Sequence, residues 1–542
     1  MSRREAWLSA ALVFVVALIV RAVFASQIVF PKPEDTAYYV GVARNLVEGR
    51  GLVSDALWSY QTPPLVFPRP AFEVWLPLPT FLAAIPMAIA GATFASAQVS
   101  SVVMGALAPV LAWRIAVDVA DERALPIGRA RTFAVGVGLT SAVYLPLVFH
   151  SSLPDSTMPF AVVALAACWL MARIARDPAG AHWTDKRVLA LGVLIGLAAL
   201  TRNEAIWLGL TWAIVAWFAT GITRGGWFRI VAAAAVVAAL VFAPWAARDW
   251  AVFGSPLPGQ AAANAFSVTG FDIFAWNDPP TLSRYLAVGP ARLIEMRVEG
   301  VTHNLFSVLL LTGLPISLLG LAALPWQGRG RTVRPLVIVG ILTFLFTSLV
   351  FPVATTWGTF LHASGPVQVL LVISAMLALD AGIARLGARL GWTRPVAWLG
   401  PALGIFGSLL FSAALLPTFG AGSRGTAEQY DELGRRLAAA GHPLDASTGP
   451  VITDFPIWLS ETAKVDALAL PDEPPADVLD LASAFPGTRL VVVMGSDHGR
   501  WPAVLDGSDA AASCFREIDL GPGPSDRADP LEDARAFEIV CP

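Results

Sequence analysis

The sequence predicts a polytopic α-helical membrane protein that carries a small α/β domain at its C-terminal end. Three observations predict this class. The 542 residues are 56% hydrophobic and only 14% charged, and the mean hydropathy of +0.64 is far above that of soluble proteins. About eleven apolar stretches are long enough to cross a bilayer, which takes roughly 20 residues. Residues 423–542 are more polar, and helix-like segments alternate there with strand-like runs.

The predicted spans begin close to the N-terminus and end before the polar region. They are residues 7–28, 97–118, 132–150, 157–174, 188–201, 204–221, 230–248, 301–324, 336–352, 363–381 and 396–417. The first is preceded by Arg3 and Arg4, as in a signal peptide, but it lacks a clear small-residue cleavage site and further apolar runs follow. We therefore expect the first span to be retained.

Residues 73–91 are apolar as well, but Pro77, Pro79 and Pro86 each remove a backbone donor and disturb a helix. The basic loops indicate how this stretch lies, because short loops rich in Lys and Arg stay in the cytoplasm. If 73–91 lies along or dips into the outer interface, all strongly basic loops are cytoplasmic; if it spans, all but the first lie outside. These loops are residues 3–4, 123–131, 173–187, 224–229, 329–334 and 385–394.

This topology predicts a multi-pass protein of the plasma (inner) membrane, with a cytoplasmic N-terminus and an extracytoplasmic C-terminal domain. The transmembrane domain covers residues 1–422, and its first outer loop, residues 29–96, contains juxtamembrane helices. The soluble α/β domain covers residues 423–542, with strands expected at 450–455, 489–495, 515–520 and 536–540 and helices at 426–440 and 476–484.

The cysteine spacing gives no indication of a structural zinc site, and the charge gives none of a nucleic-acid partner. No close Cys/His cluster indicates a structural zinc site. Cys514 and Cys541 can form a disulfide if their domain is outside the cell, and two free thiols are the alternative. The net charge is -3 and no basic stripe is present, so we expect no nucleic-acid partner.

The segment KPEDTAYYVGVARNLVEGRG, residues 32–51, places an acidic pair directly after the first span. From Asp35 onward, apolar residues such as Tyr39 recur at helical spacing, which predicts an amphipathic helix suited to the membrane interface. Asp is a preferred N-cap residue, so capping is one explanation of Asp35. Capping explains one carboxylate but not the Glu34–Asp35 pair, which makes the pair a candidate catalytic site.

Two further candidates lie in predicted outer loops. Asp155, in HSSLPDSTMPF, precedes the span from 157 and is either a helix cap or a second catalytic acid on the same side as Asp35. Arg69, in FPRPAFEVW, is either solvated or placed to bind a lipid phosphate, which a guanidinium can contact with two hydrogen bonds.

The last candidates lie at the ends of predicted spans. Arg202 and Glu204, in LTRNEAIW, form either a mutual salt bridge that permits burial or part of a functional site at the membrane edge. His362, in WGTFLHASGP, stands at the outer end of a span, where a structural polar contact is the simpler explanation.

These segments resemble the GT-C superfamily of polytopic glycosyltransferases, particularly bacterial relatives of protein O-mannosyltransferases and of the lipid A aminoarabinose transferase. The similar features are the acidic pair followed by YYVGVARNLVEGRG, the Arg69–Pro70 pair, the LPD acid Asp155 and the segment GLAALTRNEA. The match covers roughly residues 5–250 and, more loosely, the chain up to about 420. The family often has an RY-like signature near the start of a late span, where this chain reads WGTFLHASGP.

The resemblance implies transfer of a sugar from a polyprenyl-phosphate donor to a protein, lipid or glycan acceptor at the outer face, usually with inversion. It implies that Asp35 and Asp155 are catalytic acids, and the preceding Glu34 leaves open which member of the pair is the base. It further implies that Arg69 contacts the donor phosphate, and we expect Arg202, Glu204, Tyr39 and His362 to line the substrate site. Asp155 would orient the acceptor, assist Asp35 or hold a metal; no cofactor is certain, and if a divalent cation, Mg or Mn, is used, Asp35 and Asp155 would hold it.

The alternative is a multi-span transporter or flippase of a lipid-linked or small polar substrate. Transporters place ionisable residues near the bilayer midplane, often in two similar halves. The candidate residues here gather at one face and the halves show no repeat, which favours the transferase.

Overall fold

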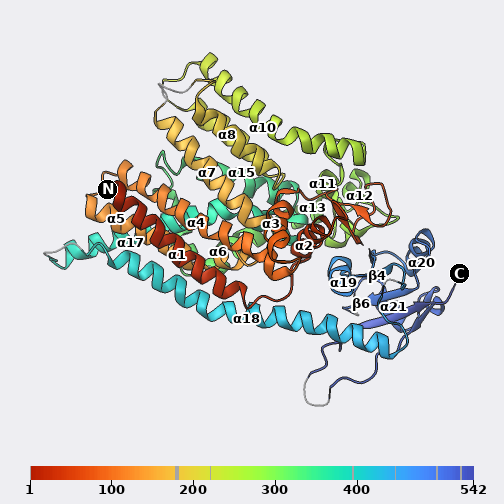
Figure 1. Cartoon of the computed structure of the whole chain (residues 1–542). Helices are drawn as coiled ribbons and strands as arrows, with labels where there is room; N and C mark the ends of the chain where they lie inside the picture. Colours follow the sequence, from red (N-terminus) through yellow and green to blue (C-terminus); the bar gives the residue numbers. More distant parts are fainter. Residues whose placement is uncertain are drawn as a thin grey trace.

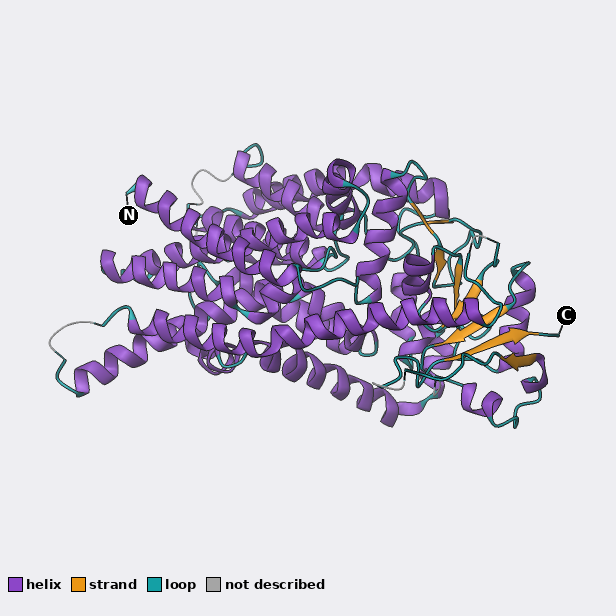
Figure 2. Cartoon of the chain, turned by 60° about the horizontal axis from the view of Figure 1, so that its bottom comes forward, coloured by secondary structure: helices purple, strands orange, loops and turns teal. Residues whose placement is uncertain are grey.

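The computed structural model describes residues 2–177, 182–219, 221–392, 396–445, 447–495, 498–524 and 528–541. Parts of two predicted basic loops, residues 178–181 and 393–395, lie outside these ranges. Helices fill most of the molecule, and the strands lie together at one end, beside the C-terminus (Figures 1 and 2). The chain is therefore a polytopic helical membrane protein with a small α/β domain, as the sequence predicts.

A helix lies at each predicted span. In chain order these helices are α1 (Arg3–Ala25), α4 (Phe94–Glu122), α5 (Ile127–Val143), α6 (Leu145–His150), α7 (Thr157–Arg176), α8 (Lys186–Ala199), α9 (Ala205–Trp217), α10 (Arg224–Phe253), α14 (Ile316–Gln327), α15 (Arg334–Val350), α17 (Gly365–Arg389) and α18 (Leu399–Ala439). Within the described residues, six helices are long and apolar enough to cross a membrane, or seven if a bent pair counts as one span. The predicted span 132–150 is divided into α5 and α6 at Tyr144, whose backbone is extended. The total of eleven spans stays a prediction.

The predicted span at 301–324 is wrong as a single helix. After α13 (Gly289–Thr302) the chain forms a π-helical segment, His303–Leu310, and a 3₁₀ turn, Leu311–Gly313. The chain then bends by 118° before α14. Gly313 and Pro315 lie at the bend, where a flexible residue and a residue without a backbone N–H end the helix.

Close packing in the helical domain depends on small residues. Gly192 and Gly196 of α8 face α10. A Cβ added to Gly192 would lie 2.7 Å from Ala234 O, and one added to Gly196 would lie 2.6 Å from Val241 Cβ. Two glycines four residues apart let helix backbones approach closely, as is common between membrane helices. This packing fixes α8, a helix of 14 residues, just before the Arg202 segment.

The first outer loop is folded against the rest of the protein. It contains α2 (Glu34–Val47), β1 (Val53–Ser54), β2 (Ala56–Leu57), β3 (Arg69–Pro70) and α3 (Leu78–Ala90). The helix predicted from Asp35 is confirmed as α2, but Glu34 begins it and Pro33 is its N-cap. The proline-bearing stretch 73–91 forms α3, whose 13 residues are fewer than a full crossing needs. The long outer loop before α13 adds the short helices α11 (Gln260–Ala263), Asn264–Phe266, Gly270–Phe274 and α12 (Leu282–Ala287).

The C-terminal domain is built on a mixed sheet. Its own strands are β4 (Val451–Thr453), β5 (Ala467–Ala469), β6 (Leu490–Val493), β7 (Phe515–Glu517) and β8 (Arg535–Ile539), and its helices are α19 (Pro456–Ala463), α20 (Pro475–Ala484) and α21 (Trp501–Leu505). The sheet order is β2-β5-β4-β6-β8-β7. The first four strands are parallel, and β8 and β7 complete the sheet in antiparallel pairs.

Two features join this domain to the membrane domain. Strand β2 comes from the first outer loop and pairs with β5, with Ala56 opposite Ala467. Helix α18 is 41 residues long and runs without a break from the membrane domain into the C-terminal domain (Figure 1). The predicted boundary between residues 422 and 423 falls inside this helix, so the two-domain division stays a prediction.

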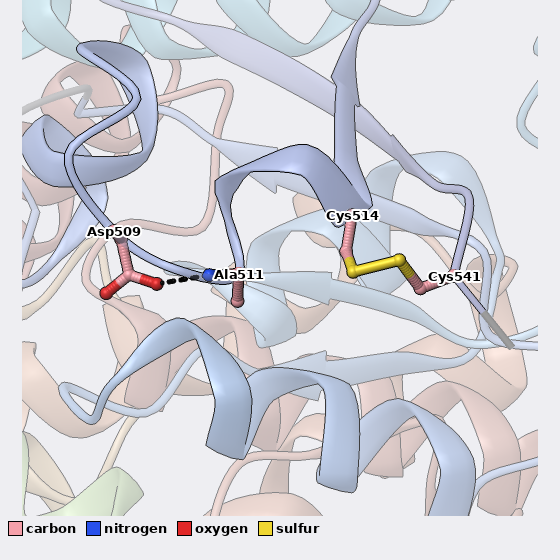
Figure 3. Close-up of a disulfide and its surroundings, with 4 residues drawn as sticks. All are labelled: Asp509, Ala511, Cys514 and Cys541. Atoms are coloured by element: carbon pink, nitrogen blue, oxygen red, sulfur yellow. Dashed lines mark hydrogen bonds between the residues drawn. A yellow bond between two sulfur atoms is a disulfide. The ribbon is translucent and has the colours of Figure 1, made fainter.

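The two cysteines of the C-terminal domain form a disulfide. Cys514 lies immediately before β7 and Cys541 follows β8, and their Cα atoms are 4.9 Å apart (Figure 3). The nearby turn is held by Asp509, whose carboxylate accepts the N–H of Ala511. The bond therefore links the two outermost strands on this side of the sheet, and Cys168 is a free, buried thiol.

Candidate active site

The centre of the site is a contact between the first outer loop and a late segment of the chain. Asp35 is the second residue of α2, and its Oδ2 lies 3.1 Å from Nε2 of His362. Oδ1 of Asp35 accepts the backbone N–H of Thr36 at 2.9 Å. The Asp35 side chain is 12% exposed and His362 is 8% exposed, so the pair is enclosed but reachable.

Asp155 joins this pair from the second outer loop. Its Oδ1 accepts the N–H of Thr157 at 2.7 Å, which stabilises the start of α7. The hydroxyl of Thr157 lies 2.6 Å from Nδ1 of His362, and Oδ2 of Asp155 lies 3.9 Å from the same nitrogen. If Nε2 of His362 donates to Asp35, Nδ1 accepts from the Thr157 hydroxyl, so one imidazole tautomer satisfies both contacts.

A third group completes the cluster. His150 ends α6, and its ring lies 6.0 Å from that of His362. One ligand atom from each of His150, Asp155 and His362 lies within 4.8 Å of the other two. Nδ1 of His150 and Oδ2 of Asp155 are buried and have no hydrogen-bond partner, which is uncommon for buried polar atoms. Unused lone pairs of His150 and Asp155 thus lie close together beside His362, and the three residues could hold a metal ion if His362 exchanged one of its two hydrogen bonds for the ion.

The donor set indicates which ions fit. Two imidazoles and one carboxylate suit a first-row transition metal or zinc, because nitrogen ligands are preferred by these ions. Mg²⁺ prefers oxygen ligands, of which this group offers one carboxylate. The sequence expectation placed a metal on Asp35 and Asp155. In the described part of the chain, the group of ligand atoms that lie close enough together consists of Asp155 and two histidines, His150 and His362. Asp35 is not a member of this group.

Burial sets the protonation of the cluster. Burial raises the pKa of the Asp155 carboxyl to about 8, and the negative charge of Asp35 adds to the effect. Burial also raises the pKa of Asp35, against the positive charge of Arg202 and the N–H of Thr36. Burial and the same arginine lower the pKa of His362. At neutral pH the imidazole is therefore neutral, and Asp155 favours a proton or a cation beside it.

Arg202 connects two segments of the site. Its guanidinium pairs with Glu204 at 2.9 and 3.1 Å, donates to Ser156 Oγ at 2.8 Å and reaches Thr359 O at 3.3 Å. It therefore ties the loop that holds Asp155 to the segment that leads to His362. The salt bridge expected between Arg202 and Glu204 is present, and it lies within reach of the charge on Asp35.

Tyr39 lies on the same side of α2, one helical turn after Asp35. It is 1% exposed, and its hydroxyl interacts with Ser156 and with the charges of Arg202, Asp35 and Asp155. Burial raises the pKa of this phenol, so it stays neutral. The structure therefore brings Tyr39, Arg202, Glu204 and His362 to the two acids.

Arg69 lies in a different environment. It is 1% exposed, pairs with Glu73 at 3.3 Å and donates to the carbonyl oxygens of Ser59 and Thr62 at 2.7 and 2.9 Å. Glu73 in turn accepts from the hydroxyl of Tyr38 at 3.4 Å. These contacts hold the turns of the first outer loop together, so the predicted phosphate contact of Arg69 has no support from its partners.

Glu34 points away from the cluster. Its Oε1 accepts the backbone N–H of Ile457, at the start of α19 in the C-terminal domain, at 3.1 Å. Burial raises the pKa of this carboxyl to about 8. Neighbouring residues of a helix point in directions about 100° apart. The acidic pair is therefore divided, with Asp35 at the cluster and Glu34 at the domain contact.

A glycine leaves space beside the reacting pair. Gly358 has a φ of +115°, and a Cβ added to it would lie 2.9 Å from Nε2 of His362, the nitrogen that contacts Asp35. Beside it, Trp357 is 55% exposed and packs on the backbone of Gly270. The segment WGTFLHASGP thus brings Gly358 against His362, at the nitrogen that contacts Asp35.

Sequence reasoning missed His150, Thr157 and Gly358. His150 had a usable signal, because it is the last residue of the predicted span 132–150, directly before the outer turn that carries Asp155. Thr157 and Gly358 carry no signal by themselves, since their roles depend on His362 packing against them.

No family model and no curated protein sequence matches this chain. Solved structures do match it. ArnT from Cupriavidus metallidurans bound to undecaprenyl phosphate is 13% identical, with 98% of each chain covered and a TM-score of 0.56. The archaeal oligosaccharyltransferase AglB from Archaeoglobus fulgidus, in complex with an inhibitory peptide and a dolichol-phosphate, is 15% identical. That match covers 89% of this chain and 69% of AglB, with a TM-score of 0.54.

The Archaeoglobus fulgidus oligosaccharyltransferase was also solved in complex with Zn and sulfate. Its sequence is 16% identical to this chain. The match covers 92% of this chain and 71% of the solved chain, with a TM-score of 0.54. The resemblance to GT-C glycosyltransferases is confirmed at the level of the fold, which this chain shares over nearly its whole length with ArnT.

Proposed function

We propose that this protein is a membrane glycosyltransferase that moves a sugar from a polyprenyl-phosphate donor to an acceptor at the outer face of the membrane, with inversion. The observation that carries the proposal is the enclosed contact of Asp35 with His362, joined by Asp155, within a fold similar to that of ArnT and AglB. ArnT was solved with undecaprenyl phosphate and AglB with a dolichol-phosphate, so a polyprenyl phosphate is the donor lipid we propose.

Asp35 is the proposed general base. It takes the proton from the acceptor hydroxyl as that oxygen attacks the anomeric carbon, and the polyprenyl phosphate leaves from the opposite face. A raised pKa makes its carboxylate a stronger base than an exposed aspartate. His362 donates to Oδ2 and the N–H of Thr36 donates to Oδ1, so both contacts hold the carboxylate in place.

The positive charge of Arg202 stabilises the anionic state of Asp35 and, in this proposal, the charge that develops on the leaving phosphate. Arg202 is 12% exposed, whereas Arg69 is 1% exposed and paired within the first loop. We therefore assign the electrostatic role to Arg202, and to Arg69 the positioning of the loop.

His150, Asp155 and His362 would hold a divalent cation, for which Mn²⁺ or Zn²⁺ fits better than Mg²⁺. Such an ion would supply positive charge for the phosphate oxygens. Independently of an ion, Asp155 and Thr157 fix the imidazole of His362, and that imidazole orients Asp35.

The orientation follows from the same arrangement. Asp35 is the second residue of α2 in the first outer loop, Asp155 precedes α7, and His362 lies in the short helix α16 (Thr359–Ala363) before α17. These positions lie at the ends of membrane helices, which favours a transferase over a transporter with a midplane site. We propose that this end, with the C-terminal domain, is extracytoplasmic and that the N-terminus is cytoplasmic, in the plasma (inner) membrane.

The test is transfer of radiolabelled sugar from a panel of polyprenyl-phosphate sugars by membranes that contain the protein. We expect one donor to give a labelled product with the wild type. Asp278 is 68% exposed and pairs with Arg284, so Asp278→Asn serves as the control for a neutralised outer-loop acid. Label transfer lost in Asp35→Asn and kept in Asp278→Asn supports the proposal; no transfer from any donor contradicts it.

A further inference from the structure

Helix α2 lies between the membrane domain and the C-terminal domain. On one side Asp35 contacts His362, and on the other side α19 packs across the helix (Figure 1). Gly41 faces α19, because a Cβ added to Gly41 would lie 3.3 Å from Oε2 of Glu461 in that helix. Arg44, one turn later, forms an ion pair with Glu461, and the two side chains are only 13% and 8% exposed. These contacts between α2 and α19, which we call the clamp, hold the helix that carries Asp35 against the C-terminal domain.

The clamp begins at Glu34. Helix α19 has no side-chain cap of its own: Phe455 is its N-cap residue and Pro456, its first residue, has no N–H. The first N–H of the helix is that of Ile457, and the Glu34 carboxyl accepts it across 423 residues of sequence. Free N–H groups at a helix start normally bind a nearby Ser, Thr, Asp or Asn. Here a residue of the first outer loop replaces that cap.

The residues before Glu34 are held by the same helical turn. The indole N–H of Trp458 donates to Pro31 O at 3.2 Å, and Nζ of Lys32 lies 5.5 Å from the centre of the indole ring. The loop is fixed further back by Ser423 of α18, whose hydroxyl accepts the N–H groups of Val29 and Phe30 at 3.0 and 2.9 Å. The chain that leads into α2 is thus attached to α18 and then to α19 of the C-terminal domain.

We propose that Glu34 is a positioning residue, through which the C-terminal domain fixes the first turn of α2 and so holds the carboxylate of Asp35 against His362. This inference rests on the proposed function of Asp35. It assigns a task to the C-terminal domain: a movement of α19 relative to α2 changes the placement of the base. It also explains why two carboxylates stand side by side, since one holds the helix and the other faces the reacting atoms.

The nature of the contact predicts which substitution preserves it. The contact needs an acceptor oxygen at Ile457 N, and glutamine supplies one with the same length of side chain. Burial raises the pKa of Glu34 to about 8, so its carboxyl is largely protonated at neutral pH and glutamine resembles it closely. Alanine removes the acceptor and leaves the N–H of Ile457 without a partner.

The experiment compares Glu34→Ala, Glu34→Gln and the control Glu48→Ala. Glu48 follows the same helix, and its side chain is 47% exposed with a long ion pair to Arg50 at 3.9 Å. For each protein we would measure kcat and KM for the lipid-linked sugar, and hydrogen exchange in peptides that cover 34–47 and 456–463. We expect Glu34→Ala to lower kcat at least about tenfold with little change in KM, because a base displaced by about 1 Å can lose 10²-fold.

In Glu34→Ala we also expect faster exchange at the starts of α2 and α19, while Glu34→Gln and Glu48→Ala stay close to the wild type in every measurement. An unchanged kcat in Glu34→Ala overturns the inference. Equal loss of kcat in Glu34→Gln overturns it as well, since the carboxyl would then act in the chemistry itself. If the wild type transfers no sugar, the proposed function fails separately. Exchange then decides the inference: unchanged exchange of α2 in Glu34→Ala refutes the clamp, and faster exchange supports it.

Discussion

Nε2 of His362 lies 3.1 Å from Oδ2 of Asp35, and this contact joins the start of the first outer loop to the segment before α17. The imidazole also lies 2.6 Å from the hydroxyl of Thr157, so it connects the candidate base to the second outer loop. One side chain thereby fixes the relative positions of three segments that are far apart in the sequence.

Replacing His362 with glutamine should lower kcat by about 10²-fold, the cost of losing a precise placement of a catalytic group. Binding of the donor lipid should change much less, because in the proposed function most of the lipid lies in the bilayer, away from His362. Sugar transfer at saturating and limiting donor separates the two effects. A variant that keeps wild-type kcat would show that Asp35 needs no orientation by His362.

The pH dependence of kcat/KM should report the raised pKa of Asp35. A base acts in its deprotonated form, so the rate falls as the pH falls through the pKa of Asp35. Burial raises that pKa above the ordinary aspartate value of about 4. The acidic limb should therefore lie above pH 4 in a pH–rate profile, and a limb at or below pH 4 would contradict an enclosed base.

Space at Gly358 should be necessary for activity. A Cβ there would lie 2.9 Å from Nε2 of His362, so Gly358→Ala should lower transfer at least about tenfold by displacing the imidazole. Gly254 is left-handed as well, with φ +72° and ψ 8°, and a Cβ added to it would meet nothing within 4 Å, so Gly254→Ala carries a similar backbone strain without the contact. Equal losses in both variants would assign the effect to strain alone.

Removal of bound metal should test the cluster of His150, Asp155 and His362. We expect the purified protein to bind Mn²⁺ or Zn²⁺. His150→Ala should lower the metal affinity by at least about 10–100-fold, which is the loss that removing even a residue that only supports a ligand causes. His182 is exposed on a loop, so His182→Ala is the control. Metal content by mass spectrometry after dialysis gives the answer, and equal content in both variants would exclude this group as the ligands.

The sequence is sufficient to predict the parts of this fold that depend on local pattern. Apolar length predicts helices at each span position, helical spacing predicts α2, and the strand-like runs become β4, β6, β7 and β8. Strand β2 escapes prediction, since its two residues become a strand only by pairing with β5. The break at 311–315 is also missed, because apolar composition alone does not distinguish a bent helix from a straight one.

The candidate site is predicted only in part, because the sequence shows the charged residues but not their partners. The candidate acids Asp35 and Asp155 stand out because an acidic pair directly follows the first span and Asp155 precedes another span on the same predicted side. The partners of a side chain depend on tertiary packing, so the sequence alone leaves open whether Arg69 faces a phosphate or Glu73. It equally leaves open which member of the acidic pair turns toward His362 and which toward Ile457.

The most direct test of Asp35 as the base is sugar transfer by Asp35→Asn and Glu34→Gln, measured in parallel on the donor that the wild type uses. We expect Asp35→Asn to lose at least the roughly 10²-fold that a general base contributes, while Glu34→Gln keeps most of the wild-type kcat. The reverse result, or equal activity in the two variants, would contradict the assignment of Asp35 as the base.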